Sequence, residues 1–236
     1  INLYKHYYLL QTTNAVKHVI QVCSSEYNVV AWPTGSGKTN IVSKIIVENL
    51  IDPVPERIIW VYSEWQPAYS NLLITIPNIE FLNGMQDDLY DSMLPSKRNL
   101  LILDDQMCEA SATNDLTKLF TKGSHHRNLS IIFIVQNLFH RGNSIRNVAL
   151  NSQYMILLSN PRDPSQISKL GEQMYPKNRK FLIDAFEDAT ARPYGFLVVD
   201  LRTETPREFR LLSNIFPGDK IVVYQSLRSE YKKIAK

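Results

Sequence analysis

Residues 32–39 read Trp-Pro-Thr-Gly-Ser-Gly-Lys-Thr, and this stretch decides the fold. From Pro33 onward it matches the phosphate-binding pattern G-x-x-x-x-G-K-[ST], although Trp32 stands where the pattern has its first glycine. Tyr27–Ala31 precedes it as a short apolar run typical of a buried strand, and residues 40–50 follow with apolar residues at helical spacing. Strand, glycine-rich loop and helix, in this order, are the setting in which a phosphate-binding loop occurs.

The residue types of this loop suit the binding of a nucleotide. Gly35 and Gly37 allow backbone conformations closed to other residues, so that successive N–H groups can point at an anion at the start of a helix. Lys38 can reach the β- and γ-phosphates, and the Thr39 hydroxyl can ligate Mg²⁺. The alternative is a chance glycine-rich turn, which leaves the lysine, the threonine and the flanking elements unexplained. We expect these residues to hold the nucleotide: Pro33, Thr34, Gly35, Ser36, Gly37, Lys38, Thr39 and Asn40.

Length and composition suit a single α/β domain with a sizeable core, because the chain has 236 residues of which 44% are hydrophobic. We expect the domain to span residues 1–217, with residues 1–26 as an N-terminal extension and residues 218–236 as a basic tail. Such a tail contacts nucleic acid in some proteins and is merely solvated in others. The formal net charge of +3 is weak evidence for any partner.

Cysteine usage and hydropathy indicate an intracellular protein. Cys23 and Cys108 lie far apart and not at metal-ligand spacing, so we expect free thiols in a reducing compartment. A packing role for Cys108 is favoured over a chemical one. No apolar run is long enough to span a bilayer, and no signal peptide is visible, so we expect no membrane span.

Apolar runs alternate with helical patterns, which predicts a mostly parallel central sheet with helices on both faces. Besides Tyr27–Ala31, the expected strands are Arg57–Tyr62, residues 79–82, residues 99–103, Leu129–Val135, Tyr154–Leu158 and Phe196–Asp200. Besides residues 40–50, the expected helices are residues 14–23, 114–122, 164–173 and 179–188.

Two acids end the apolar run at residues 100–103, in the form of a Walker B motif. In open α/β sheets ligands bind outside the carboxyl ends of the strands. We therefore expect Asp104 to hold Mg²⁺, through water, and Asp105 to orient or deprotonate the attacking water. Acids at an ordinary strand-terminal turn are the alternative, and the phosphate-binding loop upstream argues against it.

Gln136 ends the next apolar run, Leu129–Val135. In P-loop ATPases with an added central strand, that strand lies between the two Walker strands and its last polar residue sits beside the γ-phosphate. An amide can donate to phosphate and accept from water, so Gln136 is the candidate sensor of hydrolysis. A strand-terminal cap is the alternative role, and Asn137 is the second candidate.

A basic turn at residues 122–127 contains His125 and His126. Zinc is disfavoured there, because adjacent histidines point apart and no cysteine or third histidine lies at suitable spacing. A turn facing a neighbouring subunit or DNA fits better. The candidates for an arginine that stabilises the transition state of a neighbouring site are Arg127, Arg141, Arg146 and Arg162, of which we favour Arg127 and Arg146. Each could also be an ordinary surface arginine.

Ser63-Glu64-Trp65-Gln66 follows the second expected strand. Glu64 would lie at the same edge of the sheet as the nucleotide and could contact it or a neighbouring subunit. Equally, Ser63 could cap a helix while Trp65 packs.

With these motifs in order, the chain resembles the DNA-packaging ATPases of Polinton/Maverick elements and adintovirus-like viruses, within the FtsK–HerA superfamily. The resemblance covers roughly residues 27–217. It is carried by residues 33–39 (PTGSGKT), 57–67 (RIIWVYSEWQP), 99–105 (NLLILDD), 120–128 (FTKGSHHRN), 136–139 (QNLF), 160–163 (NPRD), 173–176 (QMYP) and 214–217 (NIFP).

The resemblance implies a RecA-like P-loop ATPase that uses ATP and Mg²⁺. It implies a homo-oligomeric ring that threads double-stranded viral DNA into a preformed capsid, with capsid or portal-vertex proteins as partners and the virion-assembly site of the host cell as its location. By motif match, Lys38 and Thr39 carry Walker A, Asp104 and Asp105 carry Walker B, and Gln136 is the sensor. ATP would lie between subunits, with an arginine supplied in trans.

The sequence leaves other functions open. One is a helicase or cellular translocase of the same superfamily, although no clear set of stacking aromatics for single strands is visible. Another is a non-hydrolysing nucleotide-binding assembly subunit, for which Trp32 is the one supporting feature. A small-molecule kinase would not account for both the histidine–arginine turn and Gln136.

Overall fold

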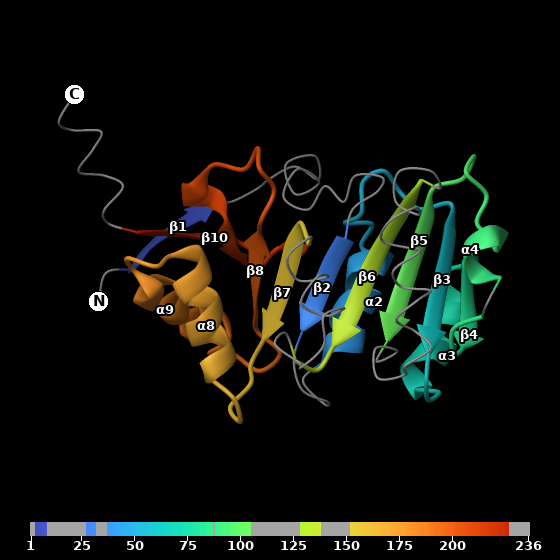
Figure 1. Cartoon of the computed structure of the whole chain (residues 1–236), viewed down its shortest axis with the longest axis horizontal. Helices are drawn as coiled ribbons and strands as arrows, with labels where there is room; N and C mark the ends of the chain where they lie inside the picture. The colour runs from blue at the N-terminus through green and yellow to red at the C-terminus, as the bar shows by residue number, and fades with distance from the viewer. Residues whose placement is uncertain are drawn as a thin grey trace.

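The computed structural model of the chain describes residues 3–8, 27–31, 37–86, 88–104, 128–137 and 152–226. Their strands form one ten-stranded sheet (Figure 1). In spatial order these are β1 (Leu3–Tyr8), β10 (Ile221–Ser226), β9 (Leu211–Ser213), β8 (Phe196–Asp200), β7 (Tyr154–Leu158), β2 (Tyr27–Ala31), β6 (Leu129–Val135), β5 (Asn99–Asp104), β3 (Arg57–Tyr62) and β4 (Ile79–Asn83).

The strands from β7 to β4 are all parallel to one another. Every residue of β5 and β6 is buried and most of them are apolar, as expected for strands covered on both faces. The predicted strands of this part are confirmed to within one residue at either end. The mostly parallel sheet with helices on both faces is therefore confirmed.

The helices lie on opposite sides of the sheet. α2 lies behind the sheet in Figure 1, and α8 and α9 lie in front of its other half. α3 packs beside α2. The described helices are α2 (Lys38–Val47), α3 (Pro67–Thr75), α4 (Leu89–Ser92), α8 (Ser165–Met174) and α9 (Arg179–Ala189), with a 3-10 turn η3 (Arg207–Phe209). None of these helices is long and apolar enough to cross a membrane.

Three helix predictions agree with the structure apart from small shifts at their ends, namely those that became α2, α8 and α9. α3 and α4 were not predicted. The expected helix cap at Ser63 is wrong, because α3 begins at Pro67 with Gln66 in the capping position and without a side-chain cap. The helices expected at residues 14–23 and 114–122 lie outside the described residues.

The antiparallel part of the sheet extends into both ends of the chain. β8 runs against β7, β9 against β8, β10 against β9, and β1 against β10. Only β8 was predicted. Residues 218–236 were expected to form a basic tail. Within them, however, Ile221–Ser226 forms β10, which pairs within the sheet and whose first four residues are buried.

The register of three parallel strands fixes the edge on which the site lies. β6 lies between β2 and β5, with Val135 opposite Ala31 and Ile134 opposite Asp104. The prediction that the strand carrying Gln136 lies between the two Walker strands is therefore confirmed. The carboxyl ends of these strands meet at the lower edge of the sheet in Figure 1.

Asp200 ends β8 with a buried carboxylate that a neighbouring arginine neutralises. Its Oδ2 lies 2.8 Å from Nη2 of Arg202 and accepts a hydrogen bond of 2.9 Å from the Thr205 hydroxyl. The Arg202 guanidinium also lies over the ring of Tyr154 in β7, 4.9 Å from the ring centre. This ion pair joins the last parallel strand to the antiparallel part of the sheet.

We expect Asp200→Ala to lower the free energy of unfolding by about 3–5 kcal/mol, because it removes the buried, hydrogen-bonded partner of the Arg202 guanidinium, whose side chain is 10% exposed. Glu204→Ala is the matched control: Glu204 also lies near Arg202, at 3.8 Å, but its side chain is 66% exposed. The control should change the free energy of unfolding by less than about 1 kcal/mol. Urea denaturation followed by circular dichroism measures both, and similar effects of the two variants would contradict this reading.

Candidate functional site

The start of α2 and the end of β5 place three predicted site residues together. Lys38 and Thr39 are the first two residues of α2, and Asp104 is the last residue of β5. The Thr39 hydroxyl lies 3.5 Å from Oδ2 of Asp104. Lys38 and Asp104 are both buried, which is rare for charged side chains that have no function or partner.

The Lys38 side chain turns toward the central strand. Its Nζ donates to the backbone carbonyl of Val135, the last residue of β6, over 3.4 Å. The ammonium group therefore lies beside the carboxyl end of β6, the strand that Gln136 follows. A buried cation at this point is a suitable partner for the negative charge of phosphate groups.

Gly37 begins α2 in a left-handed conformation, with φ of 93°. Glycine adopts this conformation without strain, and its carbonyl accepts the first helical hydrogen bond, from the Ile41 N–H over 3.0 Å. No side chain caps the helix here, and its first turn contains no acidic residue. Both features leave the positive end of the helix dipole to favour an anion.

Asp104 has a second partner that the sequence did not reveal. The Tyr69 hydroxyl, in α3, donates to Oδ2 of Asp104 over 2.8 Å, inside the core. Tyr69 packs among four other aromatic rings, with centre-to-centre distances of 4.8–5.6 Å to Trp60, Tyr62, Trp65 and Phe81. The cluster holds the tyrosine, and the tyrosine fixes the orientation of the carboxylate.

Two oxygen groups of this site suit a hard cation. Mg²⁺ takes oxygen ligands and retains several waters, so a hydroxyl and a carboxylate are an appropriate pair. Thr39 and Asp104 are the residues that could hold it. The structure thus brings together the two residues that the sequence assigned to Mg²⁺.

Gln136 and Asn137 follow β6 at the same edge. Gln136 is exposed and Asn137 half-buried. Gln136 comes directly after Val135, whose carbonyl accepts from Lys38. Its position beside the lysine is consistent with a sensor role, which stays a prediction.

Several predicted site residues lie outside the described part of the chain. They are Pro33, Thr34, Gly35, Ser36, Asp105, Arg127 and Arg146. Trp32, Arg141 and the pair His125 and His126 also lie outside it. Asn40 is described and is exposed in the first turn of α2. The roles expected for all of these residues stay predictions.

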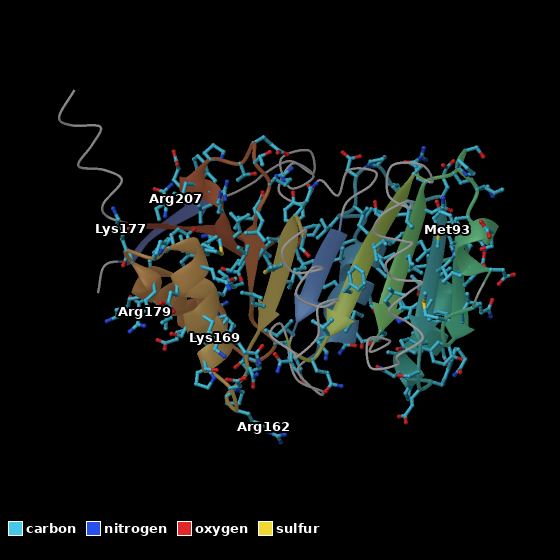
Figure 2. The ribbon with its side chains drawn as sticks, in the orientation of Figure 1. Met93, Arg162, Lys169, Lys177, Arg179 and Arg207 are labelled. Carbon is cyan, nitrogen blue, oxygen red and sulfur yellow. The ribbon has the colours of Figure 1, made fainter. Side chains whose placement is uncertain are left out.

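Arg162 is the one arginine-finger candidate that falls within the described ranges. It is exposed, and in Figure 2 it extends from the lower edge of the sheet, on the loop between β7 and α8. The loop is ordered by Asn160, whose Oδ1 accepts the backbone N–H groups of Arg162 and Asp163 at 3.1 and 3.3 Å.

Asp163 also orders this turn, because its Oδ1 accepts the backbone N–H of Ser165, the first residue of α8, over 3.2 Å. Hydrogen bonds from the Ser165 hydroxyl and the Gln166 amide hold the pKa of Asp163 below its usual value. The Asn-Pro-Arg-Asp motif thus forms a hydrogen-bonded turn on which Arg162 is exposed.

Glu64 is exposed after β3, and Trp65 beside it is 48% exposed although it contacts the aromatic cluster. The packing expected of Trp65 is thus partial. A contact between Glu64 and a neighbour or nucleotide stays a prediction.

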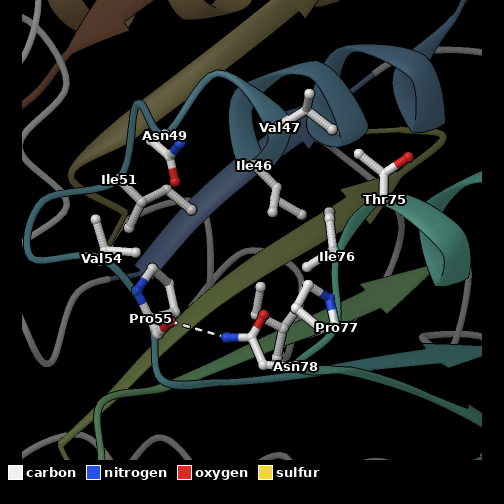
Figure 3. Close-up of a pocket in the computed structure, with 11 residues that line it drawn as sticks. Ile46, Val47, Asn49, Ile51, Val54, Pro55, Thr75, Ile76, Pro77 and Asn78 are labelled. Carbon is white, nitrogen blue, oxygen red and sulfur yellow. Dashed lines mark hydrogen bonds between the residues drawn. The ribbon is translucent and has the colours of Figure 1, made fainter.

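One pocket lies at the opposite edge of the sheet and is not part of this site. It lies beyond the end of α2 and beside the start of β3, where the Asn78 amide donates to the Pro55 carbonyl over 3.0 Å (Figure 3). Its volume of about 180 Å³ is below the range usual for ligand pockets. Much of its lining is apolar and includes Ile46, Ile51 and Ile76.

No protein-family model and no curated protein matches this sequence. Solved structures share its fold. The DNA-packaging ATPase B204 of Sulfolobus turreted icosahedral virus superposes with a TM-score of 0.51 and 11% identity, covering 78% of this chain and 96% of that one.

Two further structures are less similar. The genome-packaging NTPase B204 of Sulfolobus turreted icosahedral virus 2, solved with ATP-gammaS, gives a TM-score of 0.48 with 14% identity, covering 77% of this chain and 95% of that one. ATPases 2 and 3 of EssC from Geobacillus thermodenitrificans give a TM-score of 0.43 with 11% identity, covering 86% and 39%. The strand order and the superposition at a TM-score of 0.51 show that the chain has the RecA-like P-loop ATPase fold, as the sequence predicted.

We expect Tyr69→Phe to lower the free energy of unfolding by about 1.5–3 kcal/mol, because it removes a hydrogen bond to a buried carboxylate. Tyr62→Phe is the matched control in the same cluster, since no hydrogen bond of its hydroxyl is seen among the described residues. The control should stay within about 0.5 kcal/mol of the native chain. In an Asp104→Asn background the effect of Tyr69→Phe should shrink, and an undiminished effect would show that the two residues are not coupled.

Proposed function

We propose that this chain is an ATPase that uses Mg²⁺ and drives double-stranded viral DNA into a preformed capsid. The observation that carries the proposal is the meeting of Lys38, Thr39 and Asp104 at the carboxyl edge of the sheet. The threonine hydroxyl lies 3.5 Å from the carboxylate, with the buried lysine beside them. A phosphate-binding loop and a strand-terminal acid at this distance are the two halves of a hydrolytic nucleotide site.

Each residue then has a role in hydrolysis. Lys38 neutralises charge on the β- and γ-phosphates, the Thr39 hydroxyl ligates Mg²⁺, and Asp104 holds the ion through water. Mg²⁺ held by these residues would offset the negative charge that develops on the phosphate oxygens. Tyr69 keeps the Asp104 carboxylate in place.

The attacking water needs groups beyond those three. Asp105 is proposed to orient or deprotonate it, and Gln136 to sense the γ-phosphate. A hydrolytic site between subunits also needs an arginine from the neighbouring subunit, for which Arg127 and Arg146 are proposed. Arg162, presented on its rigid turn, is a further candidate.

Movement of DNA is supported by the order of the sequence motifs and by the fold shared with the solved DNA-packaging ATPase. A homo-oligomeric ring is proposed because it gathers small basic patches around a pore, where phosphates are tracked without reading sequence. A net charge of +3 per chain is compatible with this. Capsid or portal-vertex proteins would be the partners, at the virion-assembly site of the host cell.

Trp32 supports the second candidate, a nucleotide-binding assembly subunit that does not hydrolyse ATP. An indole in place of the first loop glycine could crowd the turn. This candidate predicts ATP binding without turnover. A helicase of the same superfamily would instead be stimulated by single-stranded DNA.

ATPase rates with and without double-stranded DNA test the proposal, for the native chain, Trp32→Gly and Lys38→Ala, each as an assembled ring. We expect DNA-stimulated turnover that Lys38→Ala abolishes, because the buried ammonium contacts the phosphates. Lys97→Ala is the matched control, since Lys97 is exposed beside the amino end of β5 and far from the site. It should keep the native rate.

The outcomes separate the candidates. Turnover only in Trp32→Gly would support the non-hydrolysing subunit. Stimulation by single strands but not by duplex would favour a helicase. No turnover in either the native chain or Trp32→Gly would overturn the proposed motor.

A further inference from the structure

The turn that leads into β8 lies against Gly37, the residue that directly precedes α2. Phe196, the first residue of β8, pairs with Leu158, the last of β7, so this turn lies at the carboxyl edge of the parallel strands. A Cβ added to Gly37 would lie 3.0 Å from Cδ1 of Tyr194. The Tyr194 ring thus lies against the start of α2, yet the residue is 71% exposed.

The backbone of the turn holds Tyr194 in an unusual conformation. Its φ is 59°, in the left-handed region that bulky residues rarely adopt. Gly195 follows with its N–H bonded to the Arg192 carbonyl over 2.9 Å, and a Cβ on Gly195 would lie 2.4 Å from the Ala189 carbonyl oxygen. Such strain persists where the surrounding structure enforces it, often at ligand sites.

Aromatic contacts tie this turn to the same helix that Gly37 begins. The Phe196 ring packs edge-on against Phe216 with centres 5.6 Å apart. Lys44, in α2, places its Nζ 4.0 Å from the centre of the Phe216 ring. The position of the turn relative to α2 is therefore fixed through the packing of Phe196 and Phe216.

The strand order shows which end of a nucleotide Tyr194 would meet. Lys38 and Asp104 lie on the side of β2 that faces β6 and β5, whereas β7 and the turn before β8 lie on its other side. If the terminal phosphate lies at Lys38 and Asp104, the ribose and base extend away from them, across Gly37. The exposed Tyr194 ring therefore lies on the side toward which the ribose and base would extend.

We propose that Tyr194 is the stacking surface for the base of a bound nucleoside triphosphate. This inference rests on the proposed nucleotide site, and it assigns a base subsite to a turn that none of the sequence motifs includes. An aromatic ring that lies beside Gly37 and is 71% exposed offers a face on which a base can stack. Because polyphosphate has no base to stack, the ring contributes affinity for nucleotides over free polyphosphate. Because every base has a face that can stack, it does so for any base.

The test compares the binding of two magnesium complexes, ATP and inorganic tripolyphosphate, by isothermal titration to the full chain. Tripolyphosphate has the phosphates but no base, so it is the matched control ligand. Tyr194→Gly should weaken ATP binding on the order of 10-fold and leave tripolyphosphate binding within about 2-fold. Tyr194→Phe retains the ring and should keep native affinity for both.

Stability separates binding from a structural role. Glycine accepts the left-handed conformation, so Tyr194→Gly should not lower the melting temperature. A clear fall in the melting temperature of Tyr194→Gly, with an equal loss of affinity for both ligands, would show that Tyr194 has a structural role and would overturn the inference.

The binding results distinguish an error in the base subsite from an error in the proposed nucleotide site. Native binding of ATP that Tyr194→Gly leaves unchanged would overturn the subsite alone. A native chain that binds neither ligand would overturn both.

Discussion

The common end point of three parallel strands is the constraint on which the rest of the structure depends. β2, β6 and β5 are hydrogen-bonded in a register that brings Ala31, Val135 and Asp104 to the same edge of the sheet. α2 begins at this same edge, where the Thr39 hydroxyl lies 3.5 Å from Oδ2 of Asp104. A shift of one residue in either pairing would turn each side chain of the shifted strand to the other face and separate these groups.

Packing on both sides of that edge supports the site. On one side, the aromatic cluster around Tyr69 holds the Asp104 carboxylate through a hydrogen bond of 2.8 Å. On the other, Phe196 and Phe216 connect the antiparallel part of the sheet to Lys44 of α2. Both halves of the sheet thus contact α2, the first half through Thr39 and Asp104 and the second through Lys44 and Phe216.

The sequence predicted what depends on local pattern. Apolar runs identified the buried parallel strands, and the polar residues at their ends correctly placed Asp104 and Gln136 at the carboxyl edge of the sheet. β9 was not predicted because it has only three residues. α3 was not predicted because it buries only Tyr69 and Leu72, which gives a weak helical pattern. The roles of Tyr69 and Tyr194 depend on long-range contacts, a hydrogen bond to β5 and a ring against Gly37, which no local pattern encodes.

The most direct measurement of the central claim is the binding of a non-hydrolysable ATP analogue to the native chain with Mg²⁺ and with EDTA. If Thr39 and Asp104 hold the ion beside Lys38, the analogue should bind about 10-fold or more tightly with Mg²⁺, and Asp104→Asn should remove most of that difference. Binding that is equal with and without Mg²⁺, or a Mg²⁺ effect that Asp104→Asn leaves intact, would contradict the account.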